Sequence, residues 1–198
     1  MCSNRTRSRT HLIASTTSSI GSSRSRTPPT RVGRVSDPVD PVRAILAALE
    51  VEHEIIECDP DLADTAEFCA HYGYSMDESA NAIVVMGKAD PPPFVMCLVL
   101  ATTQLDVNKT VRKRLGTRKA SFAPPDETAE LTGMTLGGVT PFGKPDDLPL
   151  WIDSRVMECD RVIVGGGSRD KKIYLPPSGL LALPAAEVVE DLARIPPG

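Results

Sequence analysis

The sequence predicts an α+β fold, a mixed and curled sheet resembling a pseudo-barrel and flanked by helices. Apolar runs of strand length and short amphipathic segments both occur, but they do not alternate in a sustained way. Strand-like pieces also outnumber helices in the second half of the chain. The longest apolar run, residues 94–101, falls well short of the roughly 20 residues that cross a bilayer. We therefore expect no membrane association.

The first half of the chain predicts two helices and three strands. Residues 36–52 begin with Asp and Pro and then space their apolar residues along one helix face. A short strand is expected at 53–58, followed by a helix at 64–73 that a glycine ends. Strands at 80–87 and 93–102 flank a polar, Pro-rich turn.

The second half predicts shorter elements. An amphipathic helix is expected at 106–116 and a shorter one at 126–133, each ending at a glycine. A closing helix is expected at 183–194. Between the last two helices lie four short strand-like pieces broken by Gly and Pro, at 137–143, 149–153, 161–167 and 171–176.

Charge and length divide the 198 residues into a tail and one domain. Residues 1–35 carry seven arginines and no acidic residue, and their few apolar residues predict a disordered, basic, Ser/Arg-rich tail. Residues 36–198 hold 15 basic and 26 acidic residues, a formal charge of −11, and form the predicted domain. The tail fits a disordered extension or mis-assigned start, a transit peptide, or an arm that binds RNA phosphates.

Cysteine and histidine spacing predicts neither a disulfide framework nor a metal site. The five cysteines are odd in number and scattered, which indicates reduced thiols in a cytoplasmic compartment. The three histidines lie far apart in the sequence. We therefore expect no metal and no cofactor.

One stretch resembles a phosphate-binding loop. Residues 138–144 fit the spacing G-x-x-x-x-G-K, but the next position is Pro145, which lacks the hydroxyl that would hold Mg²⁺. Pro141 also removes a backbone donor from inside the loop. The stretch therefore predicts a function other than nucleotide binding.

The order of motifs along the chain resembles the YbaK/EbsC family, the free-standing relatives of the editing domain inserted in bacterial prolyl-tRNA synthetases. The resemblance spans about residues 42–194 and includes "LDVNK", "TGMTLGGVTPFG", "LPLWID" and "VGGG". The residues that meet the family pattern are Leu105, Asp106, Lys109, Leu115, Gly116, Thr132, Gly133, Gly137, Gly138, Val139, Thr140, Pro141, Phe142, Gly143, Leu148, Pro149, Ile152, Asp153, Gly165 and Gly167.

This resemblance implies hydrolysis of the ester that joins a wrong amino acid to the 3′ end of a tRNA. It implies that water attacks the ester carbonyl with help from the terminal ribose hydroxyl, without a metal or a protein nucleophile. Backbone N–H groups near Gly137 and Gly138 would stabilise the oxyanion, while Thr140 and Pro141 would shape the loop. For the glycines, the alternative is a turn that requires positive φ.

The chain departs from the family pattern at two site positions. Asn81 stands where the family usually carries a lysine thought to meet the terminal nucleotide, and Lys88 is the nearest later lysine. Gly165 replaces a family serine. The resemblance thus implies a catalytic set of Gly137, Gly138, Asn81 and Gly165. The implied substrate-binding residues are Thr140, Pro141, Lys88, Gly166, Gly167, Ser168 and Asp153.

A basic helix predicts contact with RNA. Lys109, Arg112 and Lys113 form the densest positive cluster on an acidic domain, as tRNA phosphates require, although such a cluster can also be a solvated surface. The expected partners are the aminoacyl-tRNA 3′ end and an aminoacyl-tRNA synthetase. Two alternatives stay open, a non-catalytic module that binds the acceptor end or an aminoacyl ligand, and a small-molecule esterase. The sequence specifies neither the amino acid nor the oligomeric state.

Overall fold

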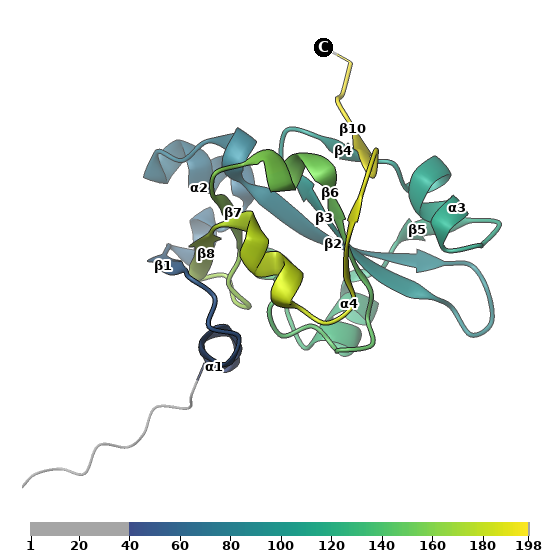
Figure 1. The fold of residues 1–198 in the computed structure, drawn as a ribbon, viewed down its shortest axis with the longest axis horizontal. Coiled ribbons are helices and arrows are strands. Elements are labelled where there is room, and N and C mark those ends of the chain that lie inside the picture. The colour runs from purple at the N-terminus through teal and green to yellow at the C-terminus, as the bar shows by residue number, and fades with distance from the viewer. Residues whose placement is uncertain (1–39, 198) are drawn as a thin grey trace, which may run out of the picture. The chain divides into compact units, whose positions relative to one another are not determined.

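A computed structural model describes residues 40–197. The basic tail expected at residues 1–35 and the expected start of the domain at residue 36 lie outside this range. The elements run in the order α1, β1, α2, β2 to β4, α3, β5, α4 and then β6 to β10, with short helical turns between them. Figure 1 shows the strands crossing the centre of the domain with helices around them.

The central sheet has five strands in the order β5-β2-β3-β6-β9. Its first three strands pair antiparallel, whereas β3 with β6 and β6 with β9 pair parallel, so the sheet is mixed. The strand bounds are Ala80–Gly87 for β2, Phe94–Leu100 for β3, Ala120–Phe122 for β5, Leu150–Asp153 for β6 and Ala186–Val189 for β9.

Two smaller sheets accompany the central one. The first has the order β1-β8-β7 and is antiparallel throughout. The second pairs β4 with β10, also antiparallel. Their bounds are Glu54–Glu57 for β1, Lys171–Leu175 for β8, Val162–Gly165 for β7, Gln104–Leu105 for β4 and Ala193–Arg194 for β10.

The helices begin and end where local chemistry favours it. Asp40 caps α1 by accepting a hydrogen bond from the Val42 amide at 3.0 Å, and the left-handed glycines Gly73 and Gly133 end α2 and α4. The α-helices are α1 (Pro41–Ala48), α2 (Thr65–Tyr72), α3 (Arg112–Arg114) and α4 (Pro125–Thr132). Shorter helical turns are η1 (Pro60–Leu62), η2 (Met76–Glu78), η3 (Val107–Val111), η4 (Ser154–Glu158) and η5 (Pro177–Ala182).

The central sheet is buried on both faces. Met96 and Leu98 of β3 face a core that α1 and η5 help to cover, whereas Val95 and Cys97 face a second core covered by η3. This two-sided burial explains why β3 has an unbroken apolar sequence.

The expected fold class is confirmed, with three local corrections. The closing helix at 183–194 is wrong, because this segment instead forms β9 and β10, with left-handed backbone at Ala185 and Asp191. The strand expected at 137–143 is also wrong, because these residues form turns. The helix at 106–116 begins as the π-helical turn η3 before α3. Among the described residues, no helix is long and apolar enough to cross a membrane.

Candidate active site

A cleft of about 210 Å³ opens where two sheets diverge. The chain next to β2 touches β7 of the neighbouring sheet through a single parallel bridge, between Ser79 and Ile163. No further bridge joins β2 to β7 among the described residues, and the cleft is lined from four sides. The lining includes Asn81 from β2, Gly137 from the loop after α4, Gly165 from β7 and Lys172 from β8. Segments distant in the sequence thus converge on one site.

Asn81 is half-buried on one wall of the cleft. Its side-chain oxygen accepts a hydrogen bond from the Thr65 hydroxyl at 2.7 Å, and Thr65 is the first residue of α2. The bond leaves the two N–H donors of the amide for a ligand. Asn81 thus supplies the cleft with a polar but uncharged side chain.

The paired glycines have different surroundings. Gly137 lines the cleft with a φ of +86°, a conformation that glycine adopts at little cost. Gly138 packs against backbone, because a Cβ there would lie 2.6 Å from the carbonyl carbon of Ser168. The structure therefore places only Gly137 on the cleft surface, with Gly138 directly behind it.

Gly165 lines the cleft at the end of β7. A Cβ at this position would lie 2.1 Å from the carbonyl oxygen of Val139, so the backbones of β7 and the 137–140 loop approach more closely than any side chain permits. The serine of the family pattern could not occupy this position without a backbone shift.

Lys172 brings a buried cation to the cleft. Only 6% of the residue is exposed, and its Nζ donates to the carbonyl oxygens of Ala63 at 2.5 Å and Gly137 at 3.3 Å. Burial lowers the pKa of this ammonium. Nζ also lies 5.6 Å from the ring centroid of Phe68, within range of a cation–π contact.

Arg169 lies at the rim of the cleft, over Gly137. Its guanidinium donates to the carbonyl oxygens of Pro60 at 3.0 Å and Leu136 at 3.4 Å, and pairs with Asp64 at 3.5 Å. The side chain thereby links the segment before α2 to the glycine loop. A second positive charge thus stands close to Lys172.

A family model described as an aminoacyl-tRNA editing domain matches residues 59–183, the range that contains every residue of the cleft. The chain belongs to this family.

Two curated relatives each match more than half of the chain. YwhH, an uncharacterised protein of Bacillus subtilis (strain 168), is 28% identical over 143 residues, which are 72% of this chain and 88% of YwhH. ProXp-y of Escherichia coli (strain K12), described as a multifunctional Ser/Thr-tRNA deacylase, is 29% identical over 119 residues, which are 59% of this chain and 71% of ProXp-y.

Two solved structures are similar in fold. A crystal structure of a candidate trans-editing enzyme for prolyl tRNA synthetase has a TM-score of 0.65 and 25% identity, covering 75% of this chain and 92% of that one. The structure of hypothetical protein APE2540 has a TM-score of 0.69 and 22% identity, covering 77% of this chain and 99% of the other. The latter likeness supports the fold alone.

Part of the implied substrate-binding set lies at a second cavity of the editing domain. Gly166, Gly167 and Ser168 line this cavity of about 260 Å³, which an ion pair between Lys171 and Asp40 borders. It is lined by the opposite side of the β7–β8 turn. These three residues are therefore not part of the cleft lining.

Thr140 and Pro141 are buried beside the cleft rather than exposed in it. The Thr140 hydroxyl accepts a hydrogen bond from the Phe142 amide at 3.3 Å, which fixes the turn after the glycine pair. The structure shows no surface on either residue that reaches the cleft lining.

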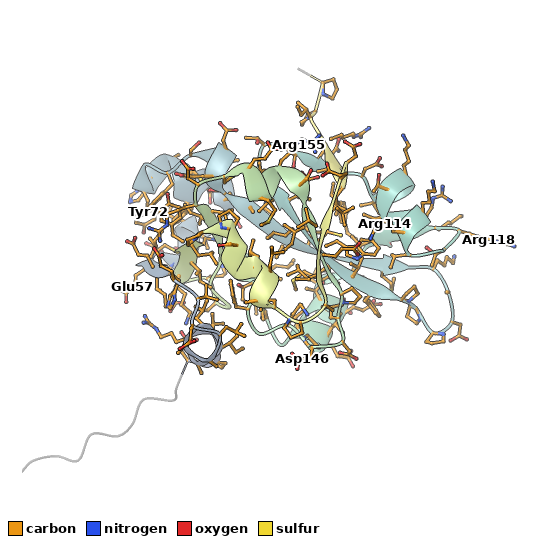
Figure 2. The ribbon with its side chains drawn as sticks, in the orientation of Figure 1. Glu57, Tyr72, Arg114, Arg118, Asp146 and Arg155 are labelled. Atoms are coloured by element: carbon orange, nitrogen blue, oxygen red, sulfur yellow. The ribbon has the colours of Figure 1, made fainter. Side chains whose placement is uncertain are left out.

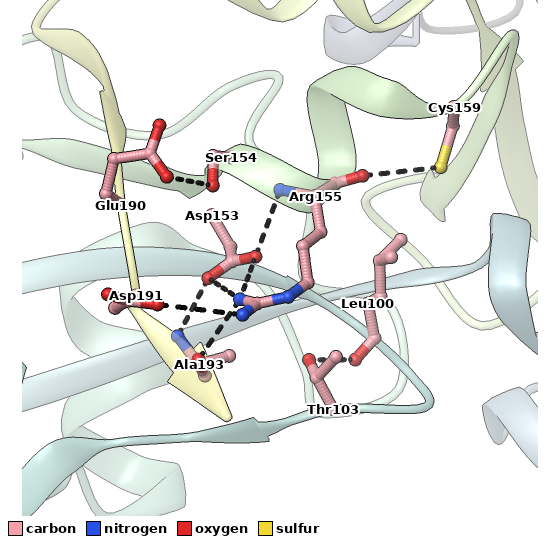
Figure 3. A network of polar contacts seen from close by, with 9 residues as sticks. All are labelled: Leu100, Thr103, Asp153, Ser154, Arg155, Cys159, Glu190, Asp191 and Ala193. Carbon is pink, nitrogen blue, oxygen red and sulfur yellow. Dashed lines mark hydrogen bonds and ion pairs between the residues drawn. The ribbon is translucent and has the colours of Figure 1, made fainter. Parts of the chain in front are cut away.

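Asp153 belongs to a separate buried network. Its carboxylate accepts from the Ala193 amide at 2.8 Å and from the guanidinium of Arg155 at 3.2 Å, and it caps η4. Figure 3 shows this carboxylate between Arg155 and β10, with Asp191 as a second acidic partner of the guanidinium. Asp153 is fully buried and does not line the cleft. The structure thus assigns it to the joining of β6 and β10.

The basic residues lie at the opposite end of β2 from Asn81. Lys88 follows the last residue of β2, and its amide donates to the Lys119 carbonyl at 2.8 Å, which places it beside the α3 region. Seven residues of extended strand correspond to roughly 20 Å. Lys109 and Lys113 are exposed, whereas Arg112 is half-buried and donates to the Asn108 carbonyl at 2.7 Å.

Figures 1 and 2 show α3 and β5, with Arg114 and Arg118 labelled, at one side of the domain, and α2 with Tyr72 at the other side. Trp151 is only 8% exposed and packs in the core under Arg114, so its ring is not available for base stacking.

The apparent phosphate-loop lysine is not available to a nucleotide. Lys144 is 6% exposed, and its Nζ donates to the carbonyl of Pro145 at 3.1 Å. Within residues 40–197, no group of three or more His, Cys, Asp or Glu side chains is arranged to hold a metal ion. The four described cysteines, which exclude Cys2, form no disulfide.

The sequence interpretation missed Lys172 and Arg169. Both follow the glycine run at 165–167, and their proximity to that run is the feature of the sequence that could have identified them. The strand pattern at 171–175 begins with two adjacent lysines, and alternation on a strand requires that they face opposite sides. One of the two therefore had to turn inward, but the sequence does not reveal what it meets there.

Proposed function

We propose that this protein is a trans-editing aminoacyl-tRNA deacylase that hydrolyses the ester of a mischarged small amino acid, acting in the cytoplasm. One observation carries the proposal: Asn81, Gly137 and Gly165, far apart in the sequence, line a single cleft in a chain of the editing family. The deacylase activity named for ProXp-y supports the reaction class.

The proposed chemistry is substrate-assisted. Water attacks the ester carbonyl while the terminal ribose hydroxyl helps to direct it, and main-chain donors at the cleft bind the oxygen that becomes negative. Gly137 lets the backbone come close to this oxygen because it has no side chain. Gly165, which also has no side chain, lets β7 on the opposite wall come close to the loop. The protein contributes mainly position and electrostatics.

The polarity of the cleft favours a small, polar acyl group. A cleft of about 210 Å³ has room for a side chain of the size of alanine, serine or threonine together with the ester. The Asn81 amide offers donors that a hydroxyl can accept. We therefore rank serine and threonine esters first, in line with the relative ProXp-y.

The tRNA body would bind at the surface around α3. Lys109, Arg112 and Lys113 belong to η3 and α3, near β5, which pairs with the end of β2 that lies roughly 20 Å from Asn81. The single-stranded 3′ end of a tRNA can bridge such a spacing. A synthetase would supply the mischarged tRNA as partner. Lys88 lies at this same end, so we assign it to phosphate binding rather than to the acyl group.

A panel of charged tRNAs tests the proposal. Wild-type protein is incubated with Ala-, Ser-, Thr-, Cys- and Pro-tRNA, and loss of the ester is followed against buffer. We expect the hydroxylated esters to decay fastest. If every ester decays at the buffer rate while an uncharged acceptor hairpin shifts in a gel, the chain is a binding module instead, an outcome that the neutral Asn81 makes the second candidate. Hydrolysis of free amino acid esters alone would indicate a small-molecule esterase.

A further inference from the structure

Lys172 is held in an unusual electrostatic setting. Its side chain enters the cleft from β8 and is 6% exposed, yet within residues 40–197 no carboxylate lies at ion-pair distance from its Nζ. Asp64 is the carboxylate that acts on the pKa of Lys172, but its ion pair is with Arg169. A buried ammonium without a carboxylate partner is costly to the fold, which indicates that its charge has a use.

The contacts of Lys172 fix its position while leaving one donor. Nζ donates to the carbonyl oxygens of Ala63 and Gly137, on two different rims of the cleft. An ammonium has three N–H donors, so a third one stays available for a ligand oxygen. Because Gly137 is itself one of the carbonyls, the ammonium lies directly beside the loop whose main chain borders the cleft.

We propose that Lys172 is a catalytic residue, whose ammonium contacts the substrate's acyl oxygen and stabilises the negative charge that forms on it. This inference rests on the proposed deacylase function. The oxygen of water bonds to the acyl carbon, and the electron pair of the C=O bond moves to the acyl oxygen, where Lys172 donates a hydrogen bond without losing its proton. The carbonyl then re-forms as the ester C–O bond breaks. The departing ribose oxygen takes the proton from the attacking water, which yields a free amino acid and an intact RNA 3′ hydroxyl.

A purely structural role is the competing explanation, since Lys172 also joins two rims. Lys172→Gln distinguishes the structural role from the catalytic one, because the Gln amide keeps two N–H donors for Ala63 and Gly137 but carries no charge. Lys172→Arg keeps the charge. Lys171→Met is the matched control, because Lys171 is the neighbouring lysine of the same strand and lines the second cavity.

Steady-state deacylation of the tRNA ester that wild type cleaves fastest is measured over a range of substrate concentrations for each full-length variant, with thermal unfolding alongside. We expect Lys172→Gln to fold and to lose about 100-fold in kcat with little change in KM, the size of effect typical of one lost oxyanion donor. Lys172→Arg retains part of the activity, and Lys171→Met retains the wild-type rate.

Wild-type kcat in Lys172→Gln would overturn the inference and leave the proposed function standing. Equal losses in Lys172→Gln and Lys172→Arg would likewise overturn it, because the charge would then not matter. If Lys172→Gln does not fold, the decision rests on Lys172→Arg against Lys171→Met. A folded Lys172→Arg variant whose activity is no higher than the uncatalysed rate then counts against the inference. A wild-type protein without turnover would instead refute the proposed function, and this inference with it.

Discussion

The amide of Gly167 donates a hydrogen bond to the carbonyl oxygen of Gly138 at 2.8 Å. This single bond fastens the β7–β8 turn to the glycine loop and forms part of the partition between the cleft and the second cavity. It also explains why the two glycines of the pair differ. Gly138 forms part of the partition, whereas Gly137 lines the cleft.

Alanine at the two paired glycines will have different effects. In Gly137→Ala the new methyl group displaces the mobile end of Arg169 and imposes a left-handed backbone that costs about 1–2 kcal/mol. We expect a folded protein whose deacylation is lost. In Gly138→Ala the methyl group meets the backbone of Ser168, which cannot move aside, so the larger loss is of folding stability. Urea unfolding together with ester hydrolysis checks both, and full activity in Gly137→Ala would remove it from the site.

Restoring the family serine at position 165 will harm the protein. The added side chain would start 2.1 Å from the carbonyl oxygen of Val139, so β7 must move away from the loop. We expect Gly165→Ser to lower the urea midpoint and to lower activity with it. Ser168→Ala, a change on the same turn, serves as control and is expected to leave both nearly unchanged. An active and fully stable Gly165→Ser protein would show that the two backbones can separate freely.

Removal of Asp153 will affect stability and not catalysis. Asp153→Ala leaves the buried amide of Ala193 without its acceptor and the guanidinium of Arg155 with only Asp191 and the Ala193 carbonyl, a loss of about 1–3 kcal/mol. The network lies outside the cleft lining, so the rate per folded molecule should stay at the wild-type value. Active-site titration combined with thermal unfolding makes the distinction. A lower rate in fully folded protein would return Asp153 to the substrate-binding set.

The buried ammonium of Lys172 predicts a pH trend in stability. Burial lowers its pKa below the ordinary value of 10.5, so as pH rises towards 10.5 the unfolded chain binds more protons than the folded one. Wild type should therefore gain free energy of unfolding relative to Lys172→Met between pH 7 and pH 10. Lys144, also buried with a lowered pKa, is present in both proteins and cancels.

Urea unfolding of both proteins at several pH values gives this difference. The charged or titratable groups that influence Lys172 are Asp64, Arg169, Cys58 and Cys69, and all are kept in the variant. A difference that shrinks as pH rises would mean that Lys172 has an acidic partner, contrary to the structure.

Charge removal near α3 will weaken binding of RNA but not the chemical step. Lys109 and Lys113 are exposed and do not line the cleft, so Lys109→Ala and Lys113→Ala should raise KM with kcat unchanged. Each should also reduce the salt-dependence slope of tRNA binding by about 1. Affinities measured at several salt concentrations give the slope. A change in kcat with an unaltered slope would exclude this surface as the tRNA contact.

Local patterns were enough to predict the central strands but not the chain's last ones. Residues 80–87 form β2 with the expected bounds, because an apolar run flanked by turns has few other solutions. The segment 183–194 spaces Val188, Val189 and Leu192 as a helix would. It forms β9 instead because the edge of β6 provides a parallel partner, and that partner is more than 30 residues away in the sequence.

The candidate site was predictable only in part, for a similar reason. The motif series identified Asn81, Gly137 and Gly165, all of which line the cleft. It did not separate them from Gly166 and Ser168, because one turn contributes residues to two cavities. Which side of a turn each residue faces depends on how neighbouring strands pair, and spacing along the chain does not contain that information.

Adjacent lysines of β8 face different compartments, Lys172 the cleft and Lys171 the second cavity. Successive residues of a strand point to opposite faces, so a shift of one residue would exchange them. Insertion or deletion of one residue between Gly166 and Asp170 would thus move the buried charge out of the cleft without altering any side chain. The length of this hairpin connection is therefore constrained as tightly as the identity of the residues within it.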